Sequence, residues 1–388
     1  MYNSNTKLSD QLTITQNKLG NGAFGCVYVA KSDGKDIAIK CESKISPVLT
    51  LLREFKVCKK IYTIKKYIKY LNQLDAAQSN EKNKIKEFVD RMELDPCIKV
   101  YNYISKNDML LMPKELDIEY LLKSKCVPET FSYIECNDFN FLTMELCGEN
   151  FENLMEKYEF AEGTKYFIAH RLLHVLSCIH RCGIIHRDIK LSNFVFDGEI
   201  TKNPNQDKNL CPMIIDMGLG KEYYKYEPDK VIQVPQVDTK SITGTLRYIS
   251  LGVHEFKSPT IVDDLISLSY ALVVIFTNKN LPWVGHKKDT DKFDHKAHSD
   301  INCKCGYHTN KENRNTRRNN TIAELKYHTP VDELVGPKYK FLAKWLRYLY
   351  SLKPKQLPSY NYMYKCLAVE SKTYSDSMYV ELIKKNTH

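Results

Sequence analysis

Short stretches of β-branched and aromatic residues near the N-terminus predict strands. Residues 12–19 and 26–31 are rich in such residues, and residues 36–40 form a third stretch after a turn at 32–34. Residues 49–70 then place apolar side chains at the three- and four-residue spacing of a helix face. The chain is therefore predicted to begin with three strands and one long helix.

The second half of the chain has a mostly helical pattern. A strand is predicted at residues 139–146, followed by helices at 151–158 and 164–182. Short strands around a loop are predicted at 184–196, another strand at 213–216, and a further helix from 262 onward. Strands that come first and helices that come later predict an α+β fold. We expect a small β-rich lobe followed by a larger α-helical lobe.

Two polar stretches interrupt this pattern, and we interpret both as insertions. Residues 65–125 are rich in Lys, Asn and Gln, and residues 287–320 are nearly devoid of apolar side chains. The most apolar run, residues 266–276, is about half as long as a membrane-spanning helix requires. We predict that this run is a buried helix and that the chain has no membrane partner.

Composition narrows the class of protein. The 388 residues carry a formal net charge of +10 and 13 cysteines, and 43% of them are hydrophobic. That length suits a two-lobed enzyme with a sizeable core. Scattered cysteines, odd in number, together with an N-terminus that lacks a secretory pattern, predict reduced thiols in a cytoplasmic or nuclear compartment.

The positive charge is compatible with nucleic acids and with acidic peptides or phosphates. The basic residues are mostly lysines scattered through the two predicted insertions, without the aromatic stripes that stack bases. We therefore expect a monomer whose main partners are protein substrates, and we rank nucleic-acid binding last.

A G-x-G-x-x-G motif follows the first predicted strand and comprises Gly20, Gly22, Ala23, Phe24 and Gly25. Glycines let backbone N–H groups approach phosphate oxygens, because they lack a Cβ atom. Alone, the motif is also compatible with a dinucleotide-binding turn, but such a turn leads into a helix, whereas a strand is predicted here. A glycine loop between two strands is typical of protein kinases.

Lys40 ends the third predicted strand, and Glu54 follows fourteen residues later in the predicted helix. In a protein kinase, the lysine at this place contacts the α- and β-phosphates of ATP, and a carboxylate from the next helix holds its ammonium group. The alternative interpretation is a surface lysine and an unrelated glutamate on a helix face. The glycine loop that precedes Lys40 favours the kinase interpretation.

The segment His-Arg-Asp-Ile-Lys-Leu-Ser-Asn at residues 186–193 has the specific spacing of a kinase catalytic loop. In that template Asp188 accepts the proton of the substrate hydroxyl, and Asn193 binds Mg²⁺. Lys190 would lie near the transferred phosphate, where a fixed cation stabilises negative charge. Asp216, in an Asp-x-Gly after a short apolar strand, is predicted to bind Mg²⁺ as well.

Three further segments resemble the casein kinase 1 group of protein kinases. They are Thr-Gly-Thr-Leu-Arg-Tyr-Ile-Ser at 243–250, Asp-Asp-Leu-Ile-Ser-Leu-Ser-Tyr at 263–270 and Leu-Pro-Trp at 281–283. The related vaccinia-related kinases fit less well, because their catalytic loop usually reads His-Gly-Asp, whereas Arg187 stands here. The resemblance implies a two-lobed protein kinase fold and a serine/threonine protein kinase that uses ATP and Mg²⁺.

The resemblance also implies the residues that contact the nucleotide. Glu145 and Cys147 would lie in the hinge that contacts adenine, directly after the gatekeeper residue Met144. Val27 and Ala38 would lie beside the nucleotide.

On the substrate side, the resemblance implies an anion site formed by Arg187, Lys221 and Arg247, which would favour acidic or already phosphorylated substrates. It also implies that Asp264 caps the backbone of the catalytic loop.

We expect one kinase domain over residues 12–367, followed by a short tail at 368–388. Its N-lobe would span about residues 12–146 and its C-lobe about residues 148–367, each with one of the two insertions. The first insertion is long for the group, which makes it a candidate docking element for an unknown partner.

The second insertion contains several residues of the types that bind zinc: His286, His295, His298, Cys303, Cys305 and His308. Their spacing does not fit a standard zinc finger, so a solvated polar loop is the favoured interpretation.

A pseudokinase scaffold that acts through its insertions is the alternative to an active enzyme. The residues that catalysis requires are all present, namely Lys40, Glu54, Asp188, Asn193 and Asp216. Their presence favours the enzyme.

Overall fold

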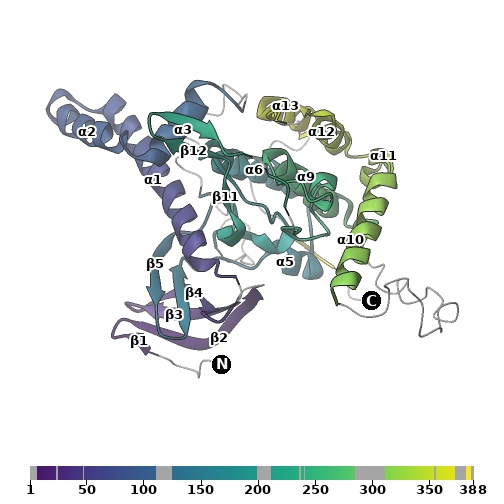
Figure 1. The fold of residues 1–388 in the computed structure, drawn as a ribbon, viewed down its shortest axis with the longest axis horizontal. Coiled ribbons are helices and arrows are strands. Elements are labelled where there is room, and N and C mark those ends of the chain that lie inside the picture. The colour runs from purple at the N-terminus through teal and green to yellow at the C-terminus, as the bar shows by residue number, and fades with distance from the viewer. Residues whose placement is uncertain are drawn as a thin grey trace.

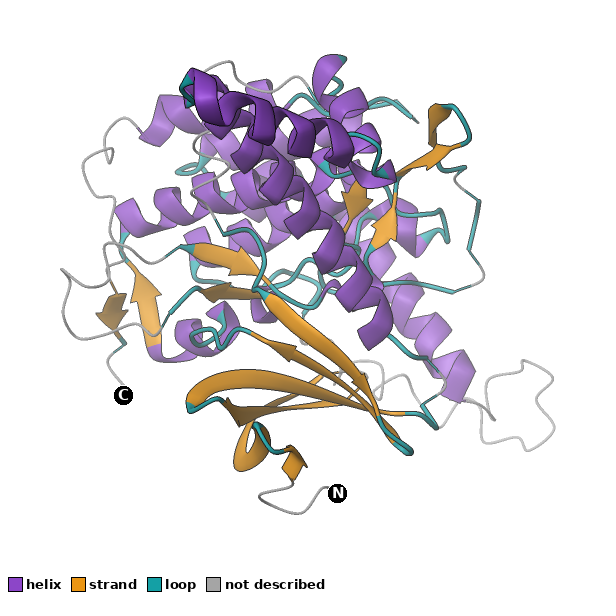
Figure 2. Ribbon diagram, turned by 90° about the vertical axis from the view of Figure 1, so that its left-hand side faces the viewer, coloured by secondary structure: helices purple, strands orange, loops and turns teal. Residues whose placement is uncertain are grey.

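The computed structural model of the chain divides into a sheet-rich N-terminal part and a helical C-terminal part (Figures 1 and 2). The residues it describes are 7–22, 25–46, 48–110, 125–198, 211–235, 237–239, 241–284, 311–353, 355–371 and 382–385. The predicted α+β arrangement, with strands first and helices later, is confirmed.

A six-stranded antiparallel sheet forms the N-terminal part, in the order β1-β2-β3-β4-β6-β5. The strands are β1 (Lys7–Ser9), β2 (Leu12–Gly22), β3 (Gly25–Ser32), β4 (Lys35–Ser43), β5 (Thr130–Glu135) and β6 (Phe139–Met144). Ile14, Ile39 and Phe141 form the centre of a small core against this sheet. Strands β2, β3, β4 and β6 confirm the sequence-based predictions, whereas β1 and β5 were not predicted.

Helix α1 (Leu51–Ala76) joins the sheet to the helical part (Figure 1). Its buried residues include Glu54, Val57, Ile61 and Ile64, which recur at three- and four-residue intervals. This stripe confirms the helix predicted from residue 49 onward, and the helix continues six residues beyond the predicted end at Tyr70.

The polar stretch 65–125 is largely helical where the structure describes it. It contains the end of α1, then α2 (Ser79–Met92) and α3 (Pro96–Lys106). Ile98 and Ile104 of α3 are buried in the main core, where α3 contacts both α1 and α6. This part of the predicted insertion therefore belongs to the packed body of the protein.

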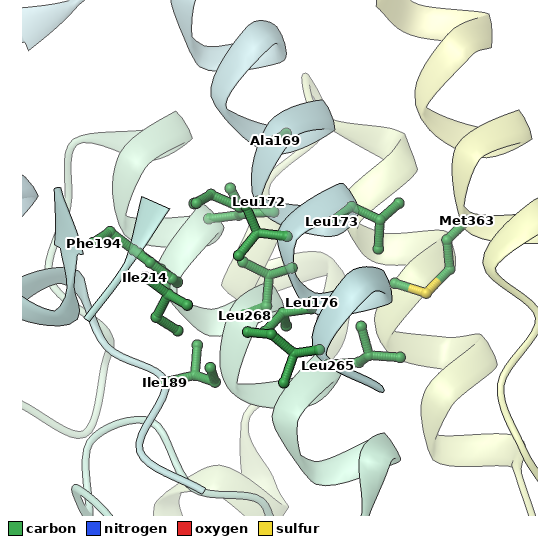
Figure 3. Packing of buried hydrophobic residues seen from close by; sticks show 14 of the residues in the cluster. Ala169, Leu172, Leu173, Leu176, Ile189, Phe194, Ile214, Leu265, Leu268 and Met363 are labelled. Atoms are coloured by element: carbon green, nitrogen blue, oxygen red, sulfur yellow. The ribbon is translucent and has the colours of Figure 1, made fainter. Parts of the chain in front are cut away.

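The helical part is built around two long helices, α6 (Glu162–Arg181) and α9 (Ile261–Thr277), which contact each other directly. Figure 3 shows Leu172 and Leu176 of α6 packed with Leu265 and Leu268 of α9. The surrounding helices are α5 (Phe151–Lys157), α8 (Leu251–His254), α10 (Lys311–His328), α11 (Val331–Val335), α12 (Lys340–Ser351) and α13 (Tyr360–Ser371).

Short antiparallel strand pairs connect these helices. The pairs are β9 (Phe194–Phe196) with β10 (Pro212–Ile214), β8 (Ile184–Ile185) with β11 (Lys221–Glu222), β12 (Tyr224–Glu227) with β13 (Lys230–Gln233), and β7 (Tyr158–Phe160) with β14 (Leu382–Lys384). The first two pairs hold the ends of the segments that carry the candidate catalytic residues.

Helix α9 confirms the buried helix predicted for residues 266–276. A capping box starts it, in which the backbone N–H of Thr260 donates to Asp263 Oδ2 at 2.6 Å. No helix within the described part of the chain is both long and apolar enough to cross a membrane.

Within the predicted surface insertion over residues 287–320, the structure describes a helical segment with one buried side chain. Residues 311–320 begin helix α10, and Asn319 is only 4% exposed. The first turns of α10 lack apolar residues, so the sequence carries no helical periodicity there. Among the described side chains of this helix, Asn319, Ile322 and Lys326 are buried. The residues of zinc-binding type from His286 to His308 lie outside the described residues.

We predict that Leu172→Ala lowers the free energy of unfolding by about 2–5 kcal/mol, because the fully buried side chain leaves a cavity between α6 and α9. Leu94→Ala is the matched control, since Leu94 is 70% exposed and its truncation should change stability by about 0.5 kcal/mol or less. Chemical denaturation of both variants checks the prediction. Equal effects of the two substitutions would contradict it.

Candidate active site

A cleft of about 420 Å³ lies between the N-terminal sheet and the helical part. Its lining contains most residues that the sequence predicted to bind nucleotide or metal: Gly20, Gly25, Val27, Ala38, Lys40, Glu54, Glu145, Cys147, Lys190, Asn193 and Asp216. Ala23 and Phe24 lie outside the described residues. The fold thus gathers into one cleft residues that are far apart in the sequence.

The glycine motif forms the tip of the β2–β3 hairpin, where Gly22 pairs with Gly25. A Cβ atom on Gly25 would lie 2.0 Å from the carbonyl oxygen of Cys41, so only glycine allows β3 to pack this closely on β4. A Cβ atom on Gly20 would have no atom within 4 Å. Packing therefore explains Gly25, whereas Gly20 leaves the backbone of the hairpin open to the cleft.

A buried ion-pair network crosses the cleft. Lys40 Nζ on β4 lies 2.6 Å from Glu54 Oε1 on α1 and 3.4 Å from Asp216 Oδ1, which follows β10. Burial by itself would lower the pKa of Lys40, but the carboxylates of Asp216 and Glu54 outweigh it and raise the pKa. Lys40 in turn lowers the pKa of Asp216. Lys40 and Asp216 therefore stay charged at neutral pH and tie the sheet to the helical part.

The carboxylate of Asp188 is held from several sides beside the same cleft. Lys190 Nζ lies 2.8 Å from Asp188 Oδ2, and Thr245 Oγ1 donates to Asp188 Oδ1 at 2.7 Å. Asn193 Nδ2 donates to the backbone carbonyl of Asp188 at 2.9 Å. These contacts leave Asp188 little freedom to rotate, so its carboxylate has a defined direction before any substrate arrives.

Asp264 on α9 holds the backbone of the catalytic loop, as the sequence predicted. Its Oδ2 accepts the N–H of His186 at 2.7 Å, and its Oδ1 accepts the N–H of Arg187 at 2.9 Å. His180 Nε2 lies 3.1 Å from Asp264 Oδ2. Burial would raise the pKa of Asp264, but the bonds from His180 and His186 outweigh burial and lower it.

Two residues of the site have backbone conformations that are uncommon for residues other than glycine. Arg187 has φ of 70° and Asp216 has φ of 67°. Such conformations cost about 1–3 kcal/mol each and persist only where other contacts enforce them. His186 Nε2 lies 3.0 Å from the carbonyl oxygen of Ile215, which joins the two strained segments. The strain therefore falls on the two loops that carry the candidate catalytic groups.

Asp216 and Asn193 both line the cleft and offer oxygen ligands, which suit Mg²⁺. Because Asn193 Nδ2 bonds to Asp188, its amide oxygen is the atom that remains for a cation. The described residues contain no group of three or more His, Cys, Asp or Glu side chains arranged to hold a metal alone. Mg²⁺ typically completes its coordination with substrate phosphates and water, so two protein ligands fit this ion.

The predicted hinge follows β6 along the wall of the cleft. Met144 ends β6 opposite Ala38 of β4, and its side chain is buried. The backbone N–H of Glu145 donates to the carbonyl of Glu129 at 2.8 Å, and the Glu145 side chain forms an ion pair with Lys125. These contacts hold the start of the hinge beside the cleft.

Two of the three cations predicted for an anion site lie together. Arg187 and Lys221 line a second cavity of about 700 Å³, with Arg53 and Lys56 of α1 on its other wall. Burial and the neighbouring charge of Arg187 both lower the pKa of Lys221. Burial and the charge of Arg53 lower the pKa of Arg187, whereas Asp264 acts in the opposite direction.

Arg247 does not belong to this cavity among the described residues. Its guanidinium lies 3.2 Å from Glu152 Oε1 on α5, while its backbone carbonyl accepts a hydrogen bond from Trp283 Nε1 at 2.8 Å. The prediction of one pocket shared by all three cations therefore does not hold for Arg247. Sequence spacing did not reveal this, because Glu152 lies 95 residues from Arg247.

Thr245 is a site residue to which the sequence analysis gave no role. It belongs to a segment whose resemblance was recognised, but its bond to Asp188 spans 57 residues. No local pattern marks a hydroxyl as the partner of a distant carboxylate, so this contact required the tertiary structure.

The cleft, the lysine–glutamate pair and the ordered aspartate are the features of a protein kinase. The family described as Protein kinase domain matches residues 94–346, which is more than half of the chain. The chain therefore belongs to the protein kinase domain family and has its two-lobed α+β fold. The glycine hairpin, Lys40 and Glu54 precede the matched residues.

Within the kinases, the chain is similar to the Casein kinase I homolog 3 of Schizosaccharomyces pombe. The two sequences are 26% identical over 257 residues, which cover 65% of this chain and 51% of that protein. The chain thus spans about half the length of this curated relative. The distant similarity supports the resemblance to the casein kinase 1 group.

We predict that Asp264→Asn lowers the free energy of unfolding by about 1–3 kcal/mol, because an amide NH₂ would face backbone N–H donors that now bond to a carboxylate. The matched control is Asp332→Asn, since the Asp332 side chain is 78% exposed. We expect the control to change stability by about 0.5 kcal/mol or less in chemical denaturation. A variant at Asp264 as stable as the control would show that the loop does not depend on this carboxylate.

Proposed function

We propose that this chain is an active serine/threonine protein kinase, which transfers the γ-phosphate of ATP to serine and threonine hydroxyls of protein substrates. The observation that supports it most strongly is the ordering of Asp188 by Lys190, Asn193 and Thr245 beside the nucleotide-sized cleft. An inactive scaffold has no need for a carboxylate held in one direction beside a paired lysine.

On the nucleotide side, Lys40 would contact the α- and β-phosphates, and Glu54 holds its ammonium group at 2.6 Å. Glu145 and Cys147 would contact the adenine ring from the hinge. Asp216 and Asn193 would hold Mg²⁺, which when bound neutralises negative charge on the phosphates.

On the substrate side, Asp188 orients the attacking hydroxyl and accepts its proton as the new oxygen–phosphorus bond forms. The bond from the γ-phosphorus to the bridging oxygen breaks, and ADP leaves. Lys190 lies 2.8 Å from Asp188 Oδ2, so its ammonium group can also reach an oxygen of the transferred phosphoryl group. Thr245 keeps the other carboxylate oxygen in place.

Acidic or phosphate-primed protein sites are the substrates that the charge of the second cavity favours. Arg187, Lys221 and Arg53 line it, and its carboxylate Glu222 forms an ion pair with Lys60. A phosphate group would accept charge-assisted hydrogen bonds from Arg187, Lys221 and Arg53. Arg247, paired with Glu152, would contribute only if that pair opens.

We expect phosphate transfer from ATP and Mg²⁺ to casein, and a fall of about 10²–10⁴-fold in the rate for Asp188→Ala, the range that a general base contributes. Asp90→Ala on the exposed face of α2 is the control and should match the wild type. Radiolabel transfer is the measurement. If a folded wild type binds ATP but transfers nothing to casein or to an acidic peptide, the scaffold alternative gains and this proposal fails.

We expect a phosphate-primed acidic peptide to be preferred over its unprimed form, and Lys221→Ala to raise the KM for the primed peptide about tenfold, through loss of a charge-assisted hydrogen bond. The KM for the unprimed peptide should change little. Lys230→Ala, an exposed lysine on β13, serves as the charge-matched control. The anion site would be disproved by equal KM values of the two variants for the primed peptide.

A further inference from the structure

Lys326 on α10 is a lysine whose ammonium group is buried. The residue is 5% exposed, and among the described residues no carboxylate acts on its charge. Burial lowers the pKa of Lys326 well below its usual value. Burying a lysine lowers the stability of the fold unless hydrogen bonds replace those it made to water. The hydrogen bonds of Lys326 are therefore the place to look for its role.

Those contacts are backbone carbonyl groups of one turn. Lys326 Nζ donates to the carbonyl of Leu246 at 2.8 Å and to that of Ile249 at 2.6 Å. The rings of Tyr270 and Trp283 each lie with their centroids 5.3 Å from Nζ, so the cation also has aromatic faces around it. The ammonium group thus bridges two points of the segment 245–249.

The turn that Lys326 bridges is directly joined to the catalytic carboxylate. Thr245, the residue before Leu246, donates to Asp188 Oδ1 at 2.7 Å, and its own carbonyl accepts the N–H of Tyr248 at 2.8 Å. Gly244, with φ of 98°, packs so tightly that a Cβ atom would lie 2.5 Å from the carbonyl oxygen of Arg187. The turn therefore rests on the catalytic loop at the place where a substrate hydroxyl must approach Asp188.

A second polar contact holds the same face of α10 in register. Asn319 lies seven residues before Lys326, two helical turns away, and its amide bonds to both the imidazole and the backbone carbonyl of His254 on α8. Ile322 lies between them on the buried face. Polar side chains of helix α10 thus bind the chain both before and after Ser250, in addition to its apolar contacts.

We propose that Lys326 is a positioning residue for phosphoryl transfer, whose ammonium group fixes the turn 245–249 so that Thr245 stays on Asp188 and the turn presents the protein substrate. The inference rests on the proposed kinase function. It extends that function to a helix that carries no kinase motif and contributes no residue to the lining of the nucleotide cleft.

Steady-state kinetics of Lys326→Met tests the proposal, because methionine keeps the apolar stem and removes the donor. We expect kcat/KM for a protein or peptide substrate to fall between about tenfold and about a hundredfold, the loss typical of a misplaced catalytic constellation, with the KM for ATP unchanged. Lys344→Met on α12, an exposed lysine, is the matched control and should behave as the wild type. Peptide kinetics equal to the control would overturn the proposal. A fall in kcat that is matched by an equal fall in the folded fraction, measured by circular dichroism, would also overturn it.

Hydrogen exchange provides a readout that needs no activity. In Lys326→Met we expect faster amide exchange in residues 244–250 and unchanged exchange in β6, and unaltered exchange in 244–250 would overturn the proposal. If Lys326→Met does not fold, Lys326→Gln is measured instead. Glutamine retains an N–H donor, so we expect a smaller increase of amide exchange in residues 244–250. If the wild type transfers no phosphate, the kinase function fails, whereas the exchange comparison still decides whether Lys326 holds the turn.

Discussion

The carboxylate of Asp264 lies beneath the catalytic loop, where burial has removed it from water and only hydrogen bonds can stabilise its charge. The loop supplies them through the N–H groups of His186 and Arg187, and α6 supplies another through His180. A straight loop could not aim two successive N–H groups at one side chain. Arg187 accordingly takes a left-handed conformation, and the direction of the next residue, Asp188, follows from it.

The remaining parts of the site attach to this loop through buried polar contacts of the same kind. Lys40 and Glu54 reach it from the sheet through Asp216, whose neighbour Ile215 bonds to His186. Lys326 reaches it from the opposite side through the turn that begins at Thr245. Each contact places a charged group in a low-dielectric environment, where a correct partner stabilises one geometry and a missing partner is costly. Such contacts fix the orientation of the side chains in the site more narrowly than apolar packing alone does.

Much of this site could be predicted from the sequence, because the motifs carry their own spacing. Gly20 and Gly25, Lys40 and Asp188 were each recognised from a few neighbours, and their order along the chain indicated that they meet. The errors have a common origin. The family resemblance places Arg247 with Arg187 and Lys221, but its partner Glu152 comes from a helix that no local pattern associates with it. The turns of α10 before Asn319 lack apolar periodicity, so the sequence predicts no helix there.

The sequence by itself determined the strands and helices with clear periodicity, the glycine hairpin, and the candidate groups for binding phosphate, metal and hydroxyl. Those properties depend on residue type and on short spacing, which the chain carries locally. The tertiary structure alone decided which distant side chains complete the site, among them Thr245 on Asp188 and Lys326 on its turn. The physical reason is that a buried hydrogen bond depends on distance and direction in space, and residues 57 or 80 positions apart acquire these only when the helices between them have packed.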